Sequence, residues 1–246
     1  MGLVQDEGDY MEQVLVFKRA DLDSLGSFQG ISTDSKYANL LEDTFFMDRD
    51  KAEEDPNFKQ VIPYILIRDQ RGHYFRYQRT KKVGEQRLAK NYSVGIGGHL
   101  NQSDLGFPCH EKSDWFGGIY NIGRNREIKE EIEFLNNNWY NAQIPSDEWY
   151  NVTRIGFLND DSNPVGSVHF AVLEMLTLIP GISIELEDDA LTDGKMDNLG
   201  NISKLNLENW SRIVVDRLID ESFQDYYCPE NEDMNDYNGI YPRHGR

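Results

Sequence analysis

The spacing of hydrophobic and polar positions along the chain predicts strands and helices in mixed order. Short aliphatic and aromatic runs between polar turns predict strands at residues 14–17, 62–68, 73–78, 92–97, 149–158, 165–176 and 182–186. Residues 168–178 are almost wholly apolar, which is typical of a central strand buried on both faces. Apolar positions at helical spacing predict helices at residues 121–134 and 207–223. We therefore expect an α/β fold, a sandwich with a mixed β-sheet between helices.

Domain organisation follows from the length and from shifts in local composition. The 246 residues can bury one sizeable core without requiring a second domain. We expect residues 1–58 to form an N-terminal extension packed on the core and residues 59–228 to form the main domain. Residues 229–246 are polar and rich in Asp, Asn, Gly and Pro, and they are expected to form an acidic, mobile tail.

Three local predictions concern the ends of these segments. Residues 34–47 are interpreted as a helix followed by a loop, and the charged residues 48–56 are expected to be exposed. Asn206 or Ser203 is expected to cap the helix predicted at residues 207–223.

Composition and charge narrow the class of protein. The net charge of −18 argues against nonspecific binding to nucleic acid, because the phosphate backbone would repel the chain. No segment approaches the roughly 18 consecutive apolar residues of a membrane helix. The first ten residues lack the features of a signal peptide, and two cysteines make no disulfide framework. We expect a cytoplasmic protein that binds neither nucleic acid nor membranes.

Three carboxylates fall on one turn of the first predicted long helix. Glu127, Glu130 and Glu131 share a face, because each helical residue advances by about 100°. Glu127 and Glu131 are like charges four residues apart, which is unfavourable on a helix unless a cation lies between them. Mg²⁺ would provide that cation. A solvated charged face, with Arg126 paired to Glu130 and Arg124 paired to Glu127, remains open on spacing alone.

The segment upstream of this helix supports the metal interpretation. A strand at residues 92–97 enters a paired-glycine turn at Gly97 and Gly98, where the backbone can approach a ligand closely. A glycine loop followed by Arg-Glu-Ile-Lys-Glu-Glu at residues 126–131 resembles the Nudix box, written Gly-x5-Glu-x7-Arg-Glu-U-x-Glu-Glu-x-Gly-U with U aliphatic. Further segments resemble an uncharacterised Nudix branch of predicted phosphoesterases, at residues 63–68, 77–79, 84–88, 158–169 and 208–211.

The chain departs from the Nudix pattern in the loop half of the box. Gly98 and Arg126 are 28 positions apart, about twice the motif spacing, which indicates an inserted loop at residues 101–118. Gly118 occupies the position of the first motif glutamate, and Glu133 replaces the late glycine. Glu133 predicts that the helix continues, to about residues 136–138. The carboxylates that could substitute for the first glutamate are Asp104, Glu111 and Asp114.

The resemblance implies a Nudix-type α/β/α sandwich and a hydrolase that depends on Mg²⁺, with Mn²⁺ as a substitute. The implied reaction cleaves a diphosphate linkage in a nucleoside-diphosphate-type or other phosphorylated small molecule. Glu127, Glu130 and Glu131 become the metal-binding and catalytic residues, and Gly98 adds a carbonyl ligand. Arg126 becomes the residue that orients these glutamates. A homodimer is compatible with this assignment.

Substrate contacts are predicted from the basic residues. The densest basic cluster in this acidic chain comprises Arg76, Arg79, Lys81, Lys82 and Arg87. Arg79 and Arg87 are interpreted as phosphate-binding residues, and a solvated hairpin tip remains the alternative. His99 follows the glycines and is interpreted as a substrate-binding residue or as a structural histidine. A zinc site of His99, Cys109 and His110 is a weaker alternative because the spacing is poor.

Two other functions stay open for a chain with this motif. The missing first glutamate is compatible with a non-catalytic Nudix-fold module that only binds its ligand. Isomerase chemistry on an isoprenyl diphosphate would require a cysteine in the site, and only Cys109 is placed to supply one. The sequence does not select the substrate.

Overall fold

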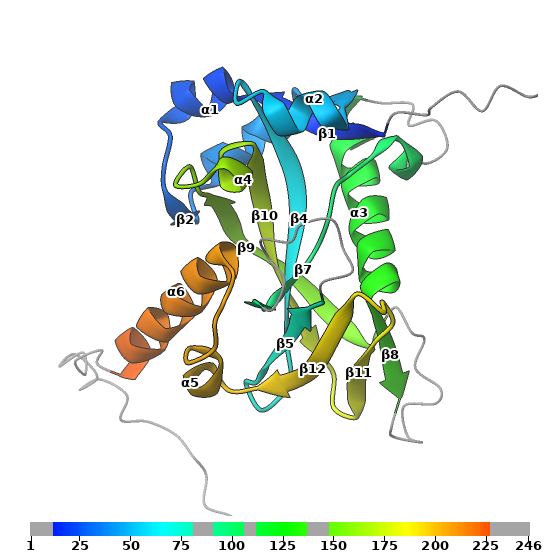
Figure 1. The fold of residues 1–246 in the computed structure, drawn as a ribbon, viewed down its shortest axis with the longest axis vertical. Coiled ribbons are helices and arrows are strands. Elements are labelled where there is room, and N and C mark those ends of the chain that lie inside the picture. The colour runs from blue at the N-terminus through cyan, green and yellow to red at the C-terminus, as the bar shows by residue number, and fades with distance from the viewer. Residues whose placement is uncertain (1–11, 81–90, 106–111, 137–147, 227–246) are drawn as a thin grey trace, which may run out of the picture.

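A mixed β-sheet forms the centre of the protein and is covered by helices on both faces (Figure 1). The computed structural model describes residues 12–80, 91–105, 112–136 and 148–226, without the side chains of residues 112–117 and 223–226. Helix α3 (Lys112–Glu131) lies on one side of the sheet and helix α6 (Asn209–Tyr226) on the other. The architecture is the expected α/β/α sandwich. Among the described helices, none is long and apolar enough to span a bilayer.

The main sheet has the strand order β12–β5–β4–β10–β9–β2. Strands β4 and β10 are parallel, and all other adjacent strands in this order are antiparallel. The mixed sheet predicted from the sequence is therefore present. These strands are β2 (Gly30–Ser32), β4 (Phe58–Arg68), β5 (Tyr74–Arg79), β9 (Tyr150–Asn159), β10 (His169–Leu178) and β12 (Leu191–Asp197). Off this path lie β1 (Gln13–Lys18), β3 (Phe45–Asp48), β6 (Tyr92–Ser93) and β7 (Gly95–Ile96).

Shorter elements complete the fold around this sheet. A separate antiparallel pair consists of β8 (Ile132–Asn136) and β11 (Ile182–Leu186). The short helices are α1 (Arg19–Leu25), α2 (Arg49–Glu54), α4 (Pro164–Ser167) and α5 (Leu199–Ile202). Two 3₁₀ helices are η1 (Ser35–Leu41) and η2 (Gln102–Asp104).

The central strand β4 is apolar at successive positions because both of its faces are buried. Tyr64 and Leu66 join the core that packs against α6, whereas Ile65 and Ile67 join the core that packs against α3. Successive side chains of a strand point to opposite faces, so a strand covered on both sides needs apolar residues throughout. Burial of each such side chain contributes roughly 1.5–3 kcal/mol. The apolar run in the sequence is thus explained by the two helical layers.

Helix α3 differs from the predicted helix at both ends. It begins at Lys112, inside the segment expected to be an inserted loop, and it ends at Glu131. The prediction that Glu133 continues the helix is wrong, because residues 132–136 form β8. In β8, Phe134 lies opposite Ile184 and Leu135 opposite Ser183. Pairing with a distant strand overrides the helical propensity of this segment.

Further corrections concern the polar segments. The charged segment at residues 48–56 is mostly exposed, as expected, but Asp48 and Ala52 are buried. It contains helix α2, capped by the Asp48 side chain, which accepts a hydrogen bond from the Lys51 amide. At the start of α6 neither Asn206 nor Ser203 is the cap; the Glu208 carboxylate accepts from the amides of residues 210 and 211. Strand β12 escaped prediction because it is polar and exists by pairing with β5.

The N-terminal residues belong to the same sheet as the rest of the chain. Strand β1 pairs with β4 through Val16 opposite Gln60, and β2 pairs with β9. Strand β4 begins at Phe58 and so runs across the division placed after residue 58. The tail at residues 229–246 lies outside the described residues.

Candidate active site

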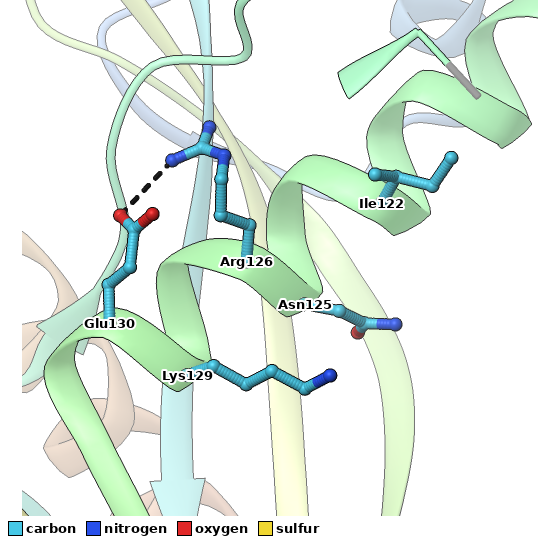
Figure 2. Close-up of a pocket in the computed structure, with 5 residues that line it drawn as sticks. All are labelled: Ile122, Asn125, Arg126, Lys129 and Glu130. Atoms are coloured by element: carbon cyan, nitrogen blue, oxygen red, sulfur yellow. Dashed lines mark hydrogen bonds and ion pairs between the residues drawn. The ribbon is translucent and has the colours of Figure 1, made fainter. Parts of the chain in front are cut away.

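Two of the three helical carboxylates turn toward the protein interior. Glu127 and Glu131 lie one turn apart on α3, and each residue is 9% exposed. Glu130 points outward, with 57% of its side chain exposed. Figure 2 shows Glu130 beside Arg126 on α3, while Lys129 extends away from both. The three glutamates were expected to share one face of the helix, but only Glu127 and Glu131 turn inward.

The environment of Glu131 opposes a negative charge. Burial raises its pKa to about 8, and the nearby carboxylates of Glu127 and Asp188 act in the same direction, whereas Arg79 lowers the pKa. Tyr77 donates its hydroxyl proton to the Gly95 carbonyl at 2.8 Å. Among the described residues, the buried Oε2 atom of Glu131 has no hydrogen-bond partner. A buried carboxylate oxygen without a partner is unfavourable and suits a site for a cation or a proton.

Glu127 shares these features to a smaller degree. Its pKa is raised by burial, which outweighs the opposing charge and hydrogen bond of Arg126. Glu127 and Glu131 also repel each other. Two buried like charges on consecutive turns require compensation, and among the described side chains of α3 Arg126 is the cation that pairs with Glu127.

Arg126 holds the loop and the helix together. Its guanidinium donates to Asp104 at 2.8 and 3.0 Å, to Glu127 at 2.7 Å and to Glu130 at 3.2 Å. It also donates to the His99 carbonyl at 2.9 Å. Arg126 therefore ties the glycine loop and η2 to α3, while its orienting role in catalysis stays a prediction. Asp104, considered as a substitute for the first motif glutamate, is fully buried and bound to Arg126, so its charge is used to position the arginine.

The glycine loop approaches the carboxylates closely. A side chain at Gly98 would collide with the Glu127 carboxylate, and one at Gly97 would collide with the Pro63 carbonyl. Neither glycine has a positive φ, and close approach to backbone explains the need for glycine at Gly97. Gly98 lies directly against the Glu127 carboxylate, and a metal bond to its carbonyl stays a prediction.

Arg79 reaches the site from strand β5. It is half-buried, and its Nη2 atom donates to the Tyr77 hydroxyl at 3.3 Å. Its pKa is raised by Tyr77 and by the nearby carboxylate of Glu131. The structure thus brings one of the two arginines predicted to bind substrate next to the inner carboxylate pair. Arg87 lies outside the described residues.

The donor set suits a divalent ion such as Mg²⁺. Buried carboxylates, an oxygen without a partner and an adjacent backbone loop are the hard oxygen ligands that Mg²⁺ prefers. The side-chain oxygens of all three glutamates do not gather within 4.8 Å of one another among the described residues. The inner pair, Glu127 and Glu131, fits the ion on this chemistry, and Glu130 remains a predicted ligand that here pairs with Arg126.

Several predicted residues lie elsewhere. Arg124 pairs with Glu174 at 3.4 Å, so the alternative pair of Arg124 with Glu127 is wrong. His99 lies next to His169, with their Nε2 atoms 3.2 Å apart. Arg76 is bound by Asp193. The predicted residues that lie outside the described part, or whose side chains are not described there, are Lys81, Lys82, Arg87, Cys109, His110, Glu111 and Asp114.

Sequence reasoning missed the residues that adjoin the site from distant segments. Tyr77 and Asp188 act on Glu131, and Glu53 and His169 adjoin His99. Tyr77 and His169 carried a signal, because each lies in a segment that resembles the Nudix branch, whereas Asp188 and Glu53 carried none. Glu53 lay in a charged segment interpreted as exposed, where one glutamate is indistinguishable from its neighbours.

Comparisons with known proteins agree with this geometry. The structure is similar to that of Tm1382, described as a candidate Nudix hydrolase, with a TM-score of 0.64, 25% identity, and coverage of 85% of this chain and 100% of that one. The chain belongs to the Nudix superfamily. In sequence it is similar to protein YmaB of Bacillus subtilis (strain 168), 34% identical over 223 residues, 86% of this chain and 99% of YmaB. No protein-family model matches the sequence.

Proposed function

We propose that the protein is a Mg²⁺-dependent hydrolase that cleaves a diphosphate linkage in a nucleoside-diphosphate-type or other phosphorylated small molecule. Membership of the Nudix superfamily supports the hydrolase class. The observation that carries the proposal is the buried pair of Glu127 and Glu131, which faces the glycine loop with one carboxylate oxygen unpaired among the described residues.

The residues that would hold the ion are Glu127, Glu131 and the backbone of Gly98. When bound there, Mg²⁺ neutralises phosphate charge and lowers the pKa of a water molecule. Glu131 would serve as an ionised ligand of the ion, so Glu127, whose pKa is raised by burial, is the carboxylate suited to accept the proton taken from the attacking water. Water adds to phosphorus, and the phosphorus–oxygen bond of the diphosphate bridge breaks, releasing two phosphate-bearing products.

Arg79 would bind the substrate phosphate in this site. The net charge of −18 repels an anionic substrate, so a cation near the carboxylates is needed to offset that field. A guanidinium can hold phosphate in a bidentate fork, and Arg79 lies close enough to Glu131 to influence its pKa. Arg126 is already bound to four groups, so its role is to position the loop and Glu127.

The test compares Glu131→Gln with Glu133→Gln, an exposed glutamate two residues away on β8. Hydrolysis of a panel of nucleoside triphosphates, dinucleoside polyphosphates and nucleotide sugars is measured with Mg²⁺, with Mn²⁺ and with EDTA. We expect turnover only with a divalent ion, and a loss of at least about a hundredfold in Glu131→Gln, comparable to removing a charge-stabilising or acid–base group. Glu133→Gln should match the parent.

Normal turnover by Glu131→Gln on the best substrate would show that the metal assignment is wrong. Binding of these compounds without turnover by the parent would indicate the non-catalytic Nudix-fold module instead. Because Glu133 is exposed on β8 and lies only two positions from Glu131, the comparison separates loss of the buried site carboxylate from the general effect of removing one charge.

A further inference from the structure

A second cluster of metal-binding side-chain types lies beside the glycine loop. Glu53 comes from α2, His99 directly follows Gly98, and His169 is the first residue of β10. One ligand atom from each lies within 4.8 Å of the other two. None of the three belongs to helix α3, although His99 lies close enough to Glu127 to lower its pKa, so the cluster adjoins the carboxylate site and shares no side chain with it.

The three ligand atoms have the spacing of a metal site. The Nε2 atoms of His99 and His169 are 3.2 Å apart, and the Oε1 atom of Glu53 is 3.6 Å from the first and 3.8 Å from the second. A point equidistant from the corners of a triangle with these sides lies about 2.1 Å from each, which is the length of a zinc–nitrogen or zinc–oxygen bond.

The tautomer of His169 is set by a backbone group. Its Nδ1 atom lies 2.7 Å from the Val165 carbonyl oxygen, which can only accept a hydrogen bond, so Nδ1 carries the proton. In the neutral ring this leaves a lone pair on Nε2, the atom that faces His99 and Glu53. Histidine ligands of metals commonly have their other nitrogen fixed by a carbonyl in this way.

The cluster is enclosed on one side and accessible on the other. His169 is buried, His99 is half-buried and Glu53 is exposed. The backbone of His99 is held by Arg126, which donates to its carbonyl at 2.9 Å. An ion bound to three protein ligands from this side could keep water in a remaining position.

We propose that Glu53, His99 and His169 bind a divalent transition-metal ion of the zinc class. Two imidazoles and one carboxylate favour zinc, iron, nickel or manganese-type ions, whereas Mg²⁺ favours oxygen ligands alone. The ion would join α2, the glycine loop and β10, and so fix the loop whose other face touches Glu127. The proposal concerns metal binding and holds whether or not the α3 site hydrolyses diphosphates.

The test is a titration of the full-length, metal-free protein with Zn²⁺ and with Co²⁺. Excess Mg²⁺ is present throughout, so that sites made of oxygen ligands alone are already filled. Calorimetry measures the affinity for Zn²⁺, and visible absorption reports the ligands of Co²⁺. We expect the protein to bind one equivalent of Zn²⁺ and to have a higher melting temperature with Zn²⁺. The absorption spectrum should be that of Co²⁺ with nitrogen ligands and a low coordination number.

Matched variants identify the ligands. Glu53→Gln and His99→Gln should each weaken Zn²⁺ binding by at least about tenfold. Loss of a residue that only hydrogen-bonds to a metal ligand already weakens metal binding by about that factor. Glu54→Gln and His73→Gln, a neighbouring glutamate and a histidine of the β4–β5 turn, should bind as the parent does. Glu131→Gln should also retain Zn²⁺ binding, which separates this site from the carboxylate pair.

Equal Zn²⁺ affinity in the parent, Glu53→Gln and His99→Gln would overturn the proposal, as would a Co²⁺ spectrum of an all-oxygen, six-coordinate ion. In either case the two histidines form a direct N–H···N hydrogen bond and Glu53 is a surface residue. If His99→Gln fails to fold, Glu53→Gln decides alone, because the exposed Glu53 side chain can be changed without opening the core.

Discussion

At the scale of single residues, the sequence predicts Glu131 as a metal ligand but does not indicate that its carboxyl group is buried. Helix spacing places it on one face with Glu127, but spacing does not show that burial raises its pKa to about 8. Tyr77 and Arg79 of β5 lie close enough to Glu131 to influence its pKa, so this environment comes from a distant strand. A carboxyl group with a raised pKa makes the stability of the metal-free protein depend on pH.

The first prediction at this scale is that the contribution of Glu131 to the free energy of unfolding falls as pH rises from 5 to 8 in EDTA, seen as the difference between the parent and Glu131→Gln. The unfolded glutamate has a pKa of about 4.3, so over this range the folded state holds a proton that the unfolded state has lost. The contribution is therefore fully present below about pH 4 and is lost as pH rises through 8. Each pKa unit corresponds to about 1.4 kcal/mol.

Glu131→Gln should remove this contribution. Urea denaturation at several pH values should show a smaller fall for the variant, which should also be the more stable protein at pH 8 without metal. Added Mg²⁺ should stabilise the parent at pH 8 and leave the variant nearly unchanged. Parallel pH profiles for the two proteins would mean that Glu131 is ionised in a structural ion pair.

At the scale of elements, strand β5 supplies the cation that faces helix α3. The predicted strand at residues 73–78 was nearly correct in extent, since β5 spans Tyr74–Arg79. Its alternation places Phe75 and Tyr77 in the core against α3, and the next inward position is Arg79. The helix therefore supplies the carboxylates of the site and the strand supplies its arginine, so neither element alone contains both charges.

We predict that Arg79→Ala raises KM for the best phosphorylated substrate, by about tenfold for each ~1.4 kcal/mol of lost binding. Arg79→Lys should recover part of the loss, because it restores charge without the bidentate fork. Arg68→Ala, an exposed arginine at the end of β4, is the control. Increasing salt should raise KM more for the parent than for Arg79→Ala. Unchanged KM in Arg79→Ala would place the substrate phosphate elsewhere.

At the scale of the whole molecule, the N-terminal residues are part of the central sheet. Leu15 and Phe17 are fully buried in the core between the sheet and α3, and β1 pairs with β4. Burial contributes roughly 1.5–3 kcal/mol for each such side chain, and the total stability of a domain is about 5–15 kcal/mol. Val14, Val16, Leu22, Tyr37, Leu40 and Leu41 are also buried, so the eight side chains together contribute as much as the whole stability of a domain.

We therefore predict that a chain of residues 59–246 does not fold, whereas removal of residues 229–246 preserves both fold and turnover. Circular dichroism and urea denaturation measure the first effect, and the hydrolase assay measures the second. The C-terminal deletion serves as the control for loss of chain length, since it removes a polar segment without motif residues. A cooperative unfolding transition in residues 59–246 would contradict the prediction.

The strands and the carboxylate face could be predicted because they depend on local periodicity. Residues 62–68 and 168–178 have few polar positions, and only a strand buried on both faces tolerates that pattern. Glu127 and Glu131 share a face through helix geometry alone. Local periodicity was insufficient at residues 132–136, where pairing with β11 changed the expected helix to a strand.

Chain order, burial pattern and the candidate carboxylates thus follow from residues close together in the sequence. The separation of Glu130 from the inner pair, the approach of Arg79 and the meeting of Glu53, His99 and His169 depend on segments that lie far apart along the chain. Their positions result from the packing of loops and helices on the finished sheet. Such contacts leave no periodic signal, because each residue has its partner in another element and at no regular spacing.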